Sequence, residues 1–293
     1  MVNFGGLTSE YTSVDRATFW VLPVPYDLTS TYQPGSRWGP TALLEASANL
    51  ELYDEALKRE TYLWGVHTLP PLEADARGPV EMIGKVRTAL LPILERNKFP
   101  VIIGGEHSIT VGVVQAMKAK YPALTVVQLD AHADLRDTYQ ESPFSHATVA
   151  RRITEMCPLV QVGIRSLSME EVSFIGKNNI KTFFADFIHE KSSWIEEICH
   201  DISGDVYLTI DLDVFDPSIM PATGTPEPDG LTWRQVVGFI DELSRKATIR
   251  GFDVMELCPI PGMIAPDFLA AKLTYRLMGY TIRSMELNHE KNE

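Results

Sequence analysis

The sequence predicts an α/β protein with three layers, α/β/α, around a central and mostly parallel sheet of about eight strands. Short runs of β-branched and aromatic residues alternate along the chain with longer segments of helical period. This alternation forms successive βαβ units, and right-handed crossovers between parallel strands place helices on both faces of one sheet.

The first strand is expected at residues 19–23, and a turn-rich loop follows it through Pro34 and Gly35. Pro40 stands where a proline favours a helix start, so a helix is expected at 40–50. A second helix is expected at 80–95, with Pro92 inside it as a possible kink. The later strands are expected at 101–103, 125–129, 160–164, 182–184, 206–210 and 251–257. The later helices are expected at 109–120, 147–156, 170–177, 194–201, 232–246 and 267–282.

The chain of 293 residues contains no internal repeat and no clear linker. A layered α/β structure of this size commonly forms one core. We therefore expect a single domain over 1–293, with about 1–18 as an N-terminal extension and about 287–293 as a solvated tail.

The composition is that of an ordinary globular protein, with 45% hydrophobic and 22% charged residues. No apolar run reaches the length that crosses a bilayer, and the polar start lacks the pattern of a secretory signal, which predicts a cytoplasmic protein without membrane contacts. The net charge of -13 disfavours nucleic acid as a partner and favours the approach of a small cation.

The segment Asp130-Ala131-His132-Ala133-Asp134 follows the strand expected at 125–129. Alternate side chains of an extended chain share one face. The three coordinating groups Asp130, His132 and Asp134 are therefore expected to point the same way and to converge on one spot.

Two more groups of candidate metal ligands follow the ends of predicted strands. Asp211 and Asp213 follow the strand at 206–210, and adjacent carboxylates without a basic partner need a cation. His107 follows the strand at 101–103, after two glycines that let the backbone turn sharply. The carboxyl ends of strands are where open α/β sheets bind their ligands.

Two imidazoles and four carboxylates form a nitrogen and oxygen donor set that suits Mn²⁺ or a similar octahedral ion. Six side chains exceed what one such ion takes while keeping a position for substrate, so two ions with shared carboxylates fit better. Two divalent ions also balance the charge of four aspartates. Each residue alone could be a helix cap or a loop side chain, but the set at successive strand ends predicts a two-metal site.

These residues resemble the ureohydrolase family, which contains arginases and agmatinases. The resemblance spans nearly the whole chain and rests on residues 25–27, 34–40, 104–107, 130–134, 211–217, 221–226 and 230–232. It implies an arginase-like fold and two Mn²⁺ per subunit. It implies that one ion is held by His107, Asp130, Asp134 and Asp211, and the other by His132, Asp130, Asp211 and Asp213.

The resemblance also implies roles for three residues. Asp134 would orient the water-derived nucleophile that attacks the guanidinium carbon. His146 would shuttle protons and help the amine leave, although a histidine at this loop position could also simply cap the following helix. Glu256 would bind the guanidinium group, with an ordinary ion pair as the alternative.

The substrate is expected to be agmatine, which would yield urea and putrescine, a polyamine precursor. The loop 135–144 lacks the asparagines with which arginases hold the α-carboxylate of arginine, and the Pro25-Tyr26-Asp27 opening is similar to that of agmatinases. Arg136 could pair with a carboxylate, which keeps arginase and guanidinobutyrase activity as alternatives.

Two further classes of protein remain possible from the sequence. One is a non-catalytic metal-binding relative, and the other is a two-metal phosphoesterase, which the lack of an Arg or Lys cluster near the motifs disfavours. The resemblance also implies a homo-oligomer, either a trimer or a hexamer.

Overall fold

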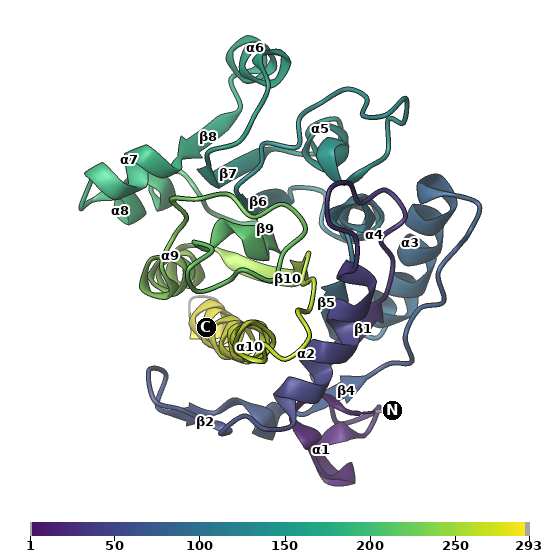
Figure 1. The fold of residues 1–293 in the computed structure, drawn as a ribbon. Helices are drawn as coiled ribbons and strands as arrows, with labels where there is room; N and C mark the ends of the chain where they lie inside the picture. Colours follow the sequence, from purple (N-terminus) through teal and green to yellow (C-terminus); the bar gives the residue numbers. More distant parts are fainter. Residues whose placement is uncertain (1, 291–293) are drawn as a thin grey trace.

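Eight parallel strands form the central sheet, in the order β4-β1-β5-β10-β9-β6-β7-β8 (Figure 1). The structure is a computed structural model that describes residues 2–290, with side chains up to residue 286. The strands of the sheet are β1 (Phe19–Val24), β4 (Val66–Thr68), β5 (Phe99–Gly104), β6 (Thr125–Leu129), β7 (Leu159–Ile164), β8 (Lys181–Phe184), β9 (Asp205–Asp211) and β10 (Thr248–Met255). The predicted fold class is confirmed.

Three short strands were missed by the sequence prediction. β4 lies at the edge of the sheet, where it pairs only with β1. It has three residues, Val66–Thr68, which are too few to form a recognisable hydrophobic run. β2 (Tyr53–Asp54) and β3 (Arg59–Glu60) form a small antiparallel pair apart from the main sheet. Two-residue strands fall below what periodicity can detect.

Helices cover both faces of the sheet. They are α1 (Ser9–Thr12), α2 (Gly39–Ser47), α3 (Pro79–Glu95), α4 (Thr110–Lys120), α5 (Val149–Thr154), α6 (Met169–Asn178), α7 (Ala185–Glu190), α8 (Trp194–Cys199), α9 (Trp233–Lys246) and α10 (Ala265–Glu290). Short 3₁₀ helices are η1 (Phe4–Gly6), η2 (Ser36–Trp38), η3 (Thr61–Trp64), η4 (His107–Ile109), η5 (His146–Thr148) and η6 (Leu212–Val214).

Several helix boundaries differ from the prediction. α10 continues to Glu290 instead of ending at 282, and residues 291–293 of the expected tail lie outside the described residues. α3 contains Pro92 in its last turns and still continues to Glu95. The N-terminal extension is packed at Phe4, which is fully buried.

The two faces of the sheet carry separate hydrophobic clusters. α2, α9 and α10 pack on one face (Figure 1). Leu43 and Phe239 are among the buried side chains there. α3, α4 and α5 pack on the other face, with Leu90, Val113 and Ile153 buried. α9 begins at a capping box formed by Thr232 and Gln235, and its apolar stripe faces the sheet. Within residues 2–290, no helix is both long and apolar enough to span a membrane.

The sheet order brings four strand ends together. β5, β10, β9 and β6 are immediate neighbours in the middle of the sheet, although the chain forms them in the order β5, β6, β9, β10. All pairs among them are parallel. Their carboxyl ends therefore lie side by side, and the segments that follow them carry the residues of the candidate site.

Candidate metal centre and active site

His107 is placed by a sharp turn after β5. A Cβ added to Gly105 would lie 1.9 Å from the carbonyl oxygen of Tyr26, so only glycine fits against that backbone. The chain then enters η4 at His107, and Nδ1 of its ring points at the aspartates while Nε2 lies 2.8 Å from Oγ1 of Thr209. The hydroxyl of Thr209 thus fixes the ring orientation from behind.

Asp130, His132 and Asp134 follow β6, but the chain there is not a continued strand. The backbone N–H of His132 donates to Oδ1 of Asp130 at 2.6 Å, and Asp134 has a left-handed backbone with φ 52°. His132 still forms an isolated parallel bridge with Ser166, whereas Asp134 leaves the extended conformation. Simple alternation therefore does not by itself account for the position of Asp134.

Asp211 and Asp213 are also joined by a turn. Asp211 ends β9 and caps η6 by accepting the backbone N–H of Asp213 at 2.9 Å. Oδ1 of Asp213 accepts the N–H of Ala131 at 3.0 Å, which ties the end of β9 to the end of β6. Asp211 is thus a helix cap and a member of the carboxylate cluster at once.

The side chains form two overlapping groups of possible metal ligands. His107, Asp130 and Asp211 form one group, and Asp130, His132 and Asp213 form the other, so Asp130 belongs to both. Nδ1 of His107 lies 3.1 Å from Asp130, 3.3 Å from Asp211 and 3.7 Å from Asp134. Nδ1 of His132 lies 2.9 Å from Oδ2 of Asp213.

The arrangement agrees with the two predicted ligand sets in part. Asp130 is shared, as expected for a bridging carboxylate. Asp134 lies near His107 but outside both groups, and Asp211 joins only the first. The roles of all six residues as metal ligands, and of Asp130 and Asp211 as bridges, stay predictions.

Burial dominates the electrostatics of the cluster. It raises the pKa of Asp130, and together with neighbouring carboxylates it raises the pKa values of Asp134 and Asp211 well above their ordinary range. Burial alone would lower the pKa of His132, but Asp213 outweighs it and raises that pKa to about 11. Without bound cations, these side chains therefore tend to keep their protons, which reduces the net negative charge of the cluster.

The donor set fits divalent metal ions. Nδ1 of His107 is buried and, in the part of the chain that the structure describes, has no hydrogen-bond partner although three carboxylates surround it. An unpaired buried nitrogen facing carboxylate oxygens is what a metal ligand needs. Oxygen and imidazole donors without sulfur suit Mn²⁺ and similar ions.

We expect added Mn²⁺ to raise the melting temperature of chelator-treated protein by at least about 5 °C, and more at pH 8 than at pH 5.5. Binding at 100 times the Kd adds about 2.7 kcal/mol per site, and each kcal/mol raises the melting temperature of a large domain by about 2–4 °C.

The sign of the pH effect follows from the raised pKa values. Asp134 and Asp211 have pKa values above the roughly 3.9 of unfolded aspartate. The metal-free fold therefore has its full stability at low pH and loses it as the pH rises through the folded pKa values. His132, with its pKa raised to about 11, acts in the same direction above about pH 6.5. Thermal unfolding with and without Mn²⁺ tests this, and a larger gain at pH 5.5 would contradict it.

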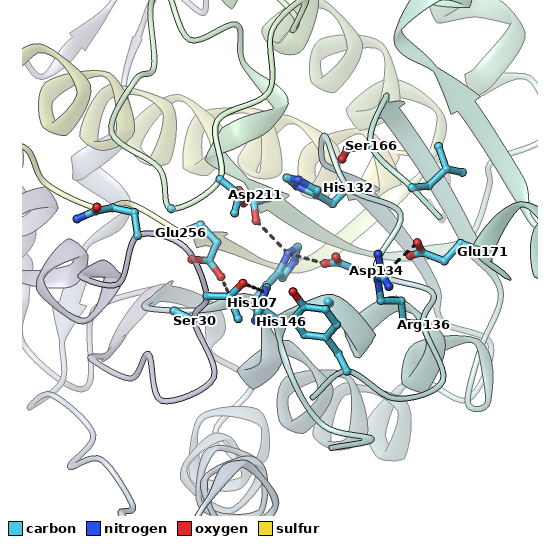
Figure 2. Close-up of a pocket in the computed structure, with 17 residues that line it drawn as sticks. Ser30, His107, His132, Asp134, Arg136, His146, Ser166, Glu171, Asp211 and Glu256 are labelled. Carbon is cyan, nitrogen blue, oxygen red and sulfur yellow. Dashed lines mark hydrogen bonds and ion pairs between the residues drawn. The ribbon is translucent and has the colours of Figure 1, made fainter. Parts of the chain in front are cut away.

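A cavity of about 220 Å³ opens above the cluster. It is lined by His107, His132, Asp134 and Asp211, and also by His146 and Glu256 (Figure 2). The predicted catalytic and guanidinium-binding residues are thus brought to the same cavity as four of the six predicted ligands. Asp130 and Asp213 lie beneath it, with relative exposures of 0% and 2%.

His146 begins η5, after the N-cap Ser145. The capping box is formed by Ser145 and Thr148, so His146 is not the helix cap. Burial, followed by the positive charge of His132, lowers the pKa of His146 to about 4. The imidazole is therefore neutral at pH 7 and able to accept a proton.

Glu256 follows β10 with a left-handed backbone, φ 65°. Its Oε1 accepts the backbone N–H of His107 at 2.6 Å. Burial and the neighbouring Glu106 raise its pKa to about 8. An ion pair with an arginine or lysine, the alternative reading of Glu256, is not found among the described residues. Its carboxylate instead faces the cavity, where a cation could pair with it.

The structure adds residues that the motifs did not identify. Glu227 lies 3.7 Å from Nε2 of His132 and accepts a hydrogen bond from Ser166. Thr31 and Tyr139 line the cavity beside His146. They stand in loops that follow strand ends, and this position is the signal that could have found them.

The comparisons with known proteins agree with this geometry. Residues 17–279 match the model of the Arginase family. The N(1)-aminopropylagmatine ureohydrolase of Synechocystis is 42% identical, over 92% of this chain and 90% of its own length. The agmatinase of Pyrococcus horikoshii is 34% identical, over 92% and 94%. The crystal structure of the agmatine ureohydrolase of Thermoplasma volcanium matches with a TM-score of 0.86 and 30% identity, covering 100% of this chain and 97% of that chain.

The fold and these relatives define a hydrolase that acts on amidino groups. The chain belongs to the Arginase family, and it is a ureohydrolase. The family predicted from the motifs is confirmed.

Proposed function

We propose that the enzyme holds two Mn²⁺ ions in the His107 and His132 groups and releases urea from a cationic, agmatine-type substrate. One observation carries this proposal. Two histidines and four aspartates gather at three neighbouring strand ends, and four of these six side chains line one cavity together with His146 and Glu256 (Figure 2).

The chemistry divides among the residues by position. Bound ions would lower the pKa of water and stabilise negative charge that develops on oxygen. Glu256 would pair with the guanidinium group and hold its carbon toward the cluster. Asp134, beside both groups, would accept a hydrogen bond from the attacking water and orient it. His146, neutral at pH 7, would move a proton to the leaving amine.

The far end of the cavity favours a cation over a carboxylate. Arg136 is the one arginine among the described lining residues, and it is already engaged. Its Nε lies 3.8 Å from Glu171 and its guanidinium stacks over the ring of Tyr139 at 5.2 Å. An α-carboxylate would have to displace these contacts. This argues against arginine and 4-guanidinobutyrate. The lack of a free cationic cluster among the described residues that line the cavity argues against a phosphate ester.

The names of the relatives point to two different agmatine-type substrates. Those named N(1)-aminopropylagmatine ureohydrolase are 36–42% identical to this chain, and those named agmatinase are 31–34% identical. We therefore propose N1-aminopropylagmatine as the first substrate and agmatine, with putrescine as its product, as the second. Both carry the positive charge that a protein of net charge -13 attracts.

A urea-release assay with Mn²⁺ tests the proposal, using N1-aminopropylagmatine, agmatine, arginine and 4-guanidinobutyrate as separate substrates. We expect kcat/KM to decrease in that order. Faster turnover of arginine than of either amine would overturn the substrate proposal but leave the site intact. Two bound ions without urea from any substrate would indicate a non-catalytic relative.

Glu256→Gln should lower kcat/KM for the preferred substrate by about 10–100-fold, because a hydrogen bond to a charged partner contributes about 1.5–3 kcal/mol. The bound metal, measured by elemental analysis, should stay at the wild-type level. Glu170→Gln is the matched control, since Glu170 is an exposed glutamate at the start of α6. An unchanged kcat/KM in Glu256→Gln would remove this residue from substrate binding.

The oligomer of three or six chains stays a prediction. Gel filtration with light scattering would measure the mass of the assembly.

A further inference from the structure

We propose that Thr29, anchored on the buried carboxylate of Glu106, positions His146 and fixes the tautomer in which Nδ1 carries the proton. Nε2 is then the nitrogen that exchanges a proton with the substrate. This inference rests on the proposed role of His146 in urea release. Thr29 and Glu106 act through His146 and are positioning residues.

Glu106 is a rigid anchor for the loop that follows β1. It is fully buried, and its two oxygens accept from three donors. The N–H of Thr29 donates to Oε2 at 2.6 Å, and the hydroxyl of Thr29 donates to Oε1 at 2.6 Å. The hydroxyl of Ser108 also donates to Oε1. These hydrogen bonds to a buried carboxyl group hold the backbone and the hydroxyl of Thr29 in place.

The hydroxyl of Thr29 meets His146 at two points. Oγ1 accepts the backbone N–H of His146 at 3.1 Å and lies 3.4 Å from Nδ1 of its ring. A hydroxyl has one proton to donate, and the carboxylate at 2.6 Å is much nearer than the ring nitrogen at 3.4 Å. The proton of Thr29 therefore points to Glu106, and only a protonated Nδ1 can form a hydrogen bond to Oγ1.

The other ring nitrogen faces the substrate side. Nε2 lies 3.3 Å from Oγ1 of Thr31, which lines the cavity, whereas Thr29 is not among its lining residues. The edge of Tyr139 packs on the ring at 5.6 Å between centroids. The neutral imidazole thus presents a lone pair at Nε2 to the cavity.

This orientation completes the proton balance of the reaction. Water adds its oxygen to the guanidinium carbon, the bond from that carbon to the substituted nitrogen breaks, and urea and an ammonium group form. Both protons of the water end on the amine nitrogen. Nε2 accepts one of them and then donates it, while Nδ1–H stays bonded to Thr29 and stabilises the transient imidazolium.

A double-mutant cycle of Thr29→Val and His146→Ala tests the inference in Mn²⁺-loaded enzyme. Valine keeps the shape of threonine but removes the hydroxyl. We expect Thr29→Val to lower kcat about tenfold in the wild-type background and less than about twofold in the His146→Ala background, because residues that act as one unit are not additive. Thr29→Ser should recover most of the wild-type kcat.

Controls separate this inference from the proposed function. Thr88→Val, the same change at an exposed position on α3, should leave kcat unchanged. Metal content should equal that of the wild type in every variant. Absence of urea from the wild-type enzyme would overturn the proposed function itself. With an active wild type, an equal loss in both backgrounds, or no loss in either, would overturn the role of Thr29.

The tautomer can be observed directly. In histidine-labelled protein loaded with the diamagnetic ion Zn²⁺, ¹⁵N NMR distinguishes a protonated Nδ1 from a protonated Nε2, and His146→Ala identifies the signal. We expect the Nδ1–H form in the wild type and a mixture of forms in Thr29→Val. A wild-type spectrum of the Nε2–H form would overturn the inference.

Discussion

We expect Asp130→Asn to bind fewer than two metal ions and to lower kcat by more than about 100-fold. Asp130 is the one residue shared by both groups of candidate ligands, and it is fully buried. Loss of a residue that only supports a metal ligand costs about 10–100-fold in affinity or activity, so loss of a shared ligand should cost more. Elemental analysis and urea release measure the two effects.

The fold of this variant should survive. Asparagine has the shape of aspartate, and burial raises the pKa of Asp130, so removal of this charge relieves the metal-free protein. Asp137→Asn is the control, because Asp137 is an exposed carboxylate on the loop 135–144 that pairs with Arg152. Two retained ions and near wild-type turnover in Asp130→Asn would contradict the metal assignment.

His146→Ala should lower kcat by about 10²–10⁴-fold, which is the usual contribution of a positioned acid or base. The metal content should not change, because His146 belongs to neither candidate ligand group. KM should change little, since Glu256 and not His146 is proposed to hold the guanidinium group. Steady-state kinetics with the preferred substrate separates kcat from KM.

His189→Ala provides the matched control. His189 lies on α7, and its Nε2 contacts the backbone oxygen of Asp229, away from the cavity. Its loss should leave kcat near the wild-type value. If His146→Ala instead lost metal and activity together, His146 would have to be treated as part of the metal centre.

Much of the fold could be predicted because its strands and helices have strong periodic patterns. β5 and β9 are buried along almost their whole length, and their central residues are mostly apolar. β4 could not be found, because its three residues become a strand only through pairing with β1. The order of the strands could not be predicted from the sequence either, because β10 lies between β5 and β9 through contacts between residues far apart in the chain.

The candidate site residues could be picked out from the sequence because their chemistry is unusual at strand ends. Aspartates and histidines after apolar strands are hard to explain without a cation, and the structure does gather them. Thr29 and Glu106 were not singled out as site residues, because a threonine in a loop and a glutamate beside a histidine are ordinary in isolation. Their importance arises from hydrogen bonds across 77 positions of the chain.

The left-handed backbones of Asp134 and Glu256 have a consequence for how the enzyme could evolve or be engineered. Residues with a Cβ in sparsely populated backbone regions cost about 1–3 kcal/mol each, and glycine would remove that cost. Selection for stability alone would therefore replace both residues. Attempts to make this protein more heat-resistant by relieving unfavourable backbone torsions should exclude these two positions, because their side chains are proposed to act in the site.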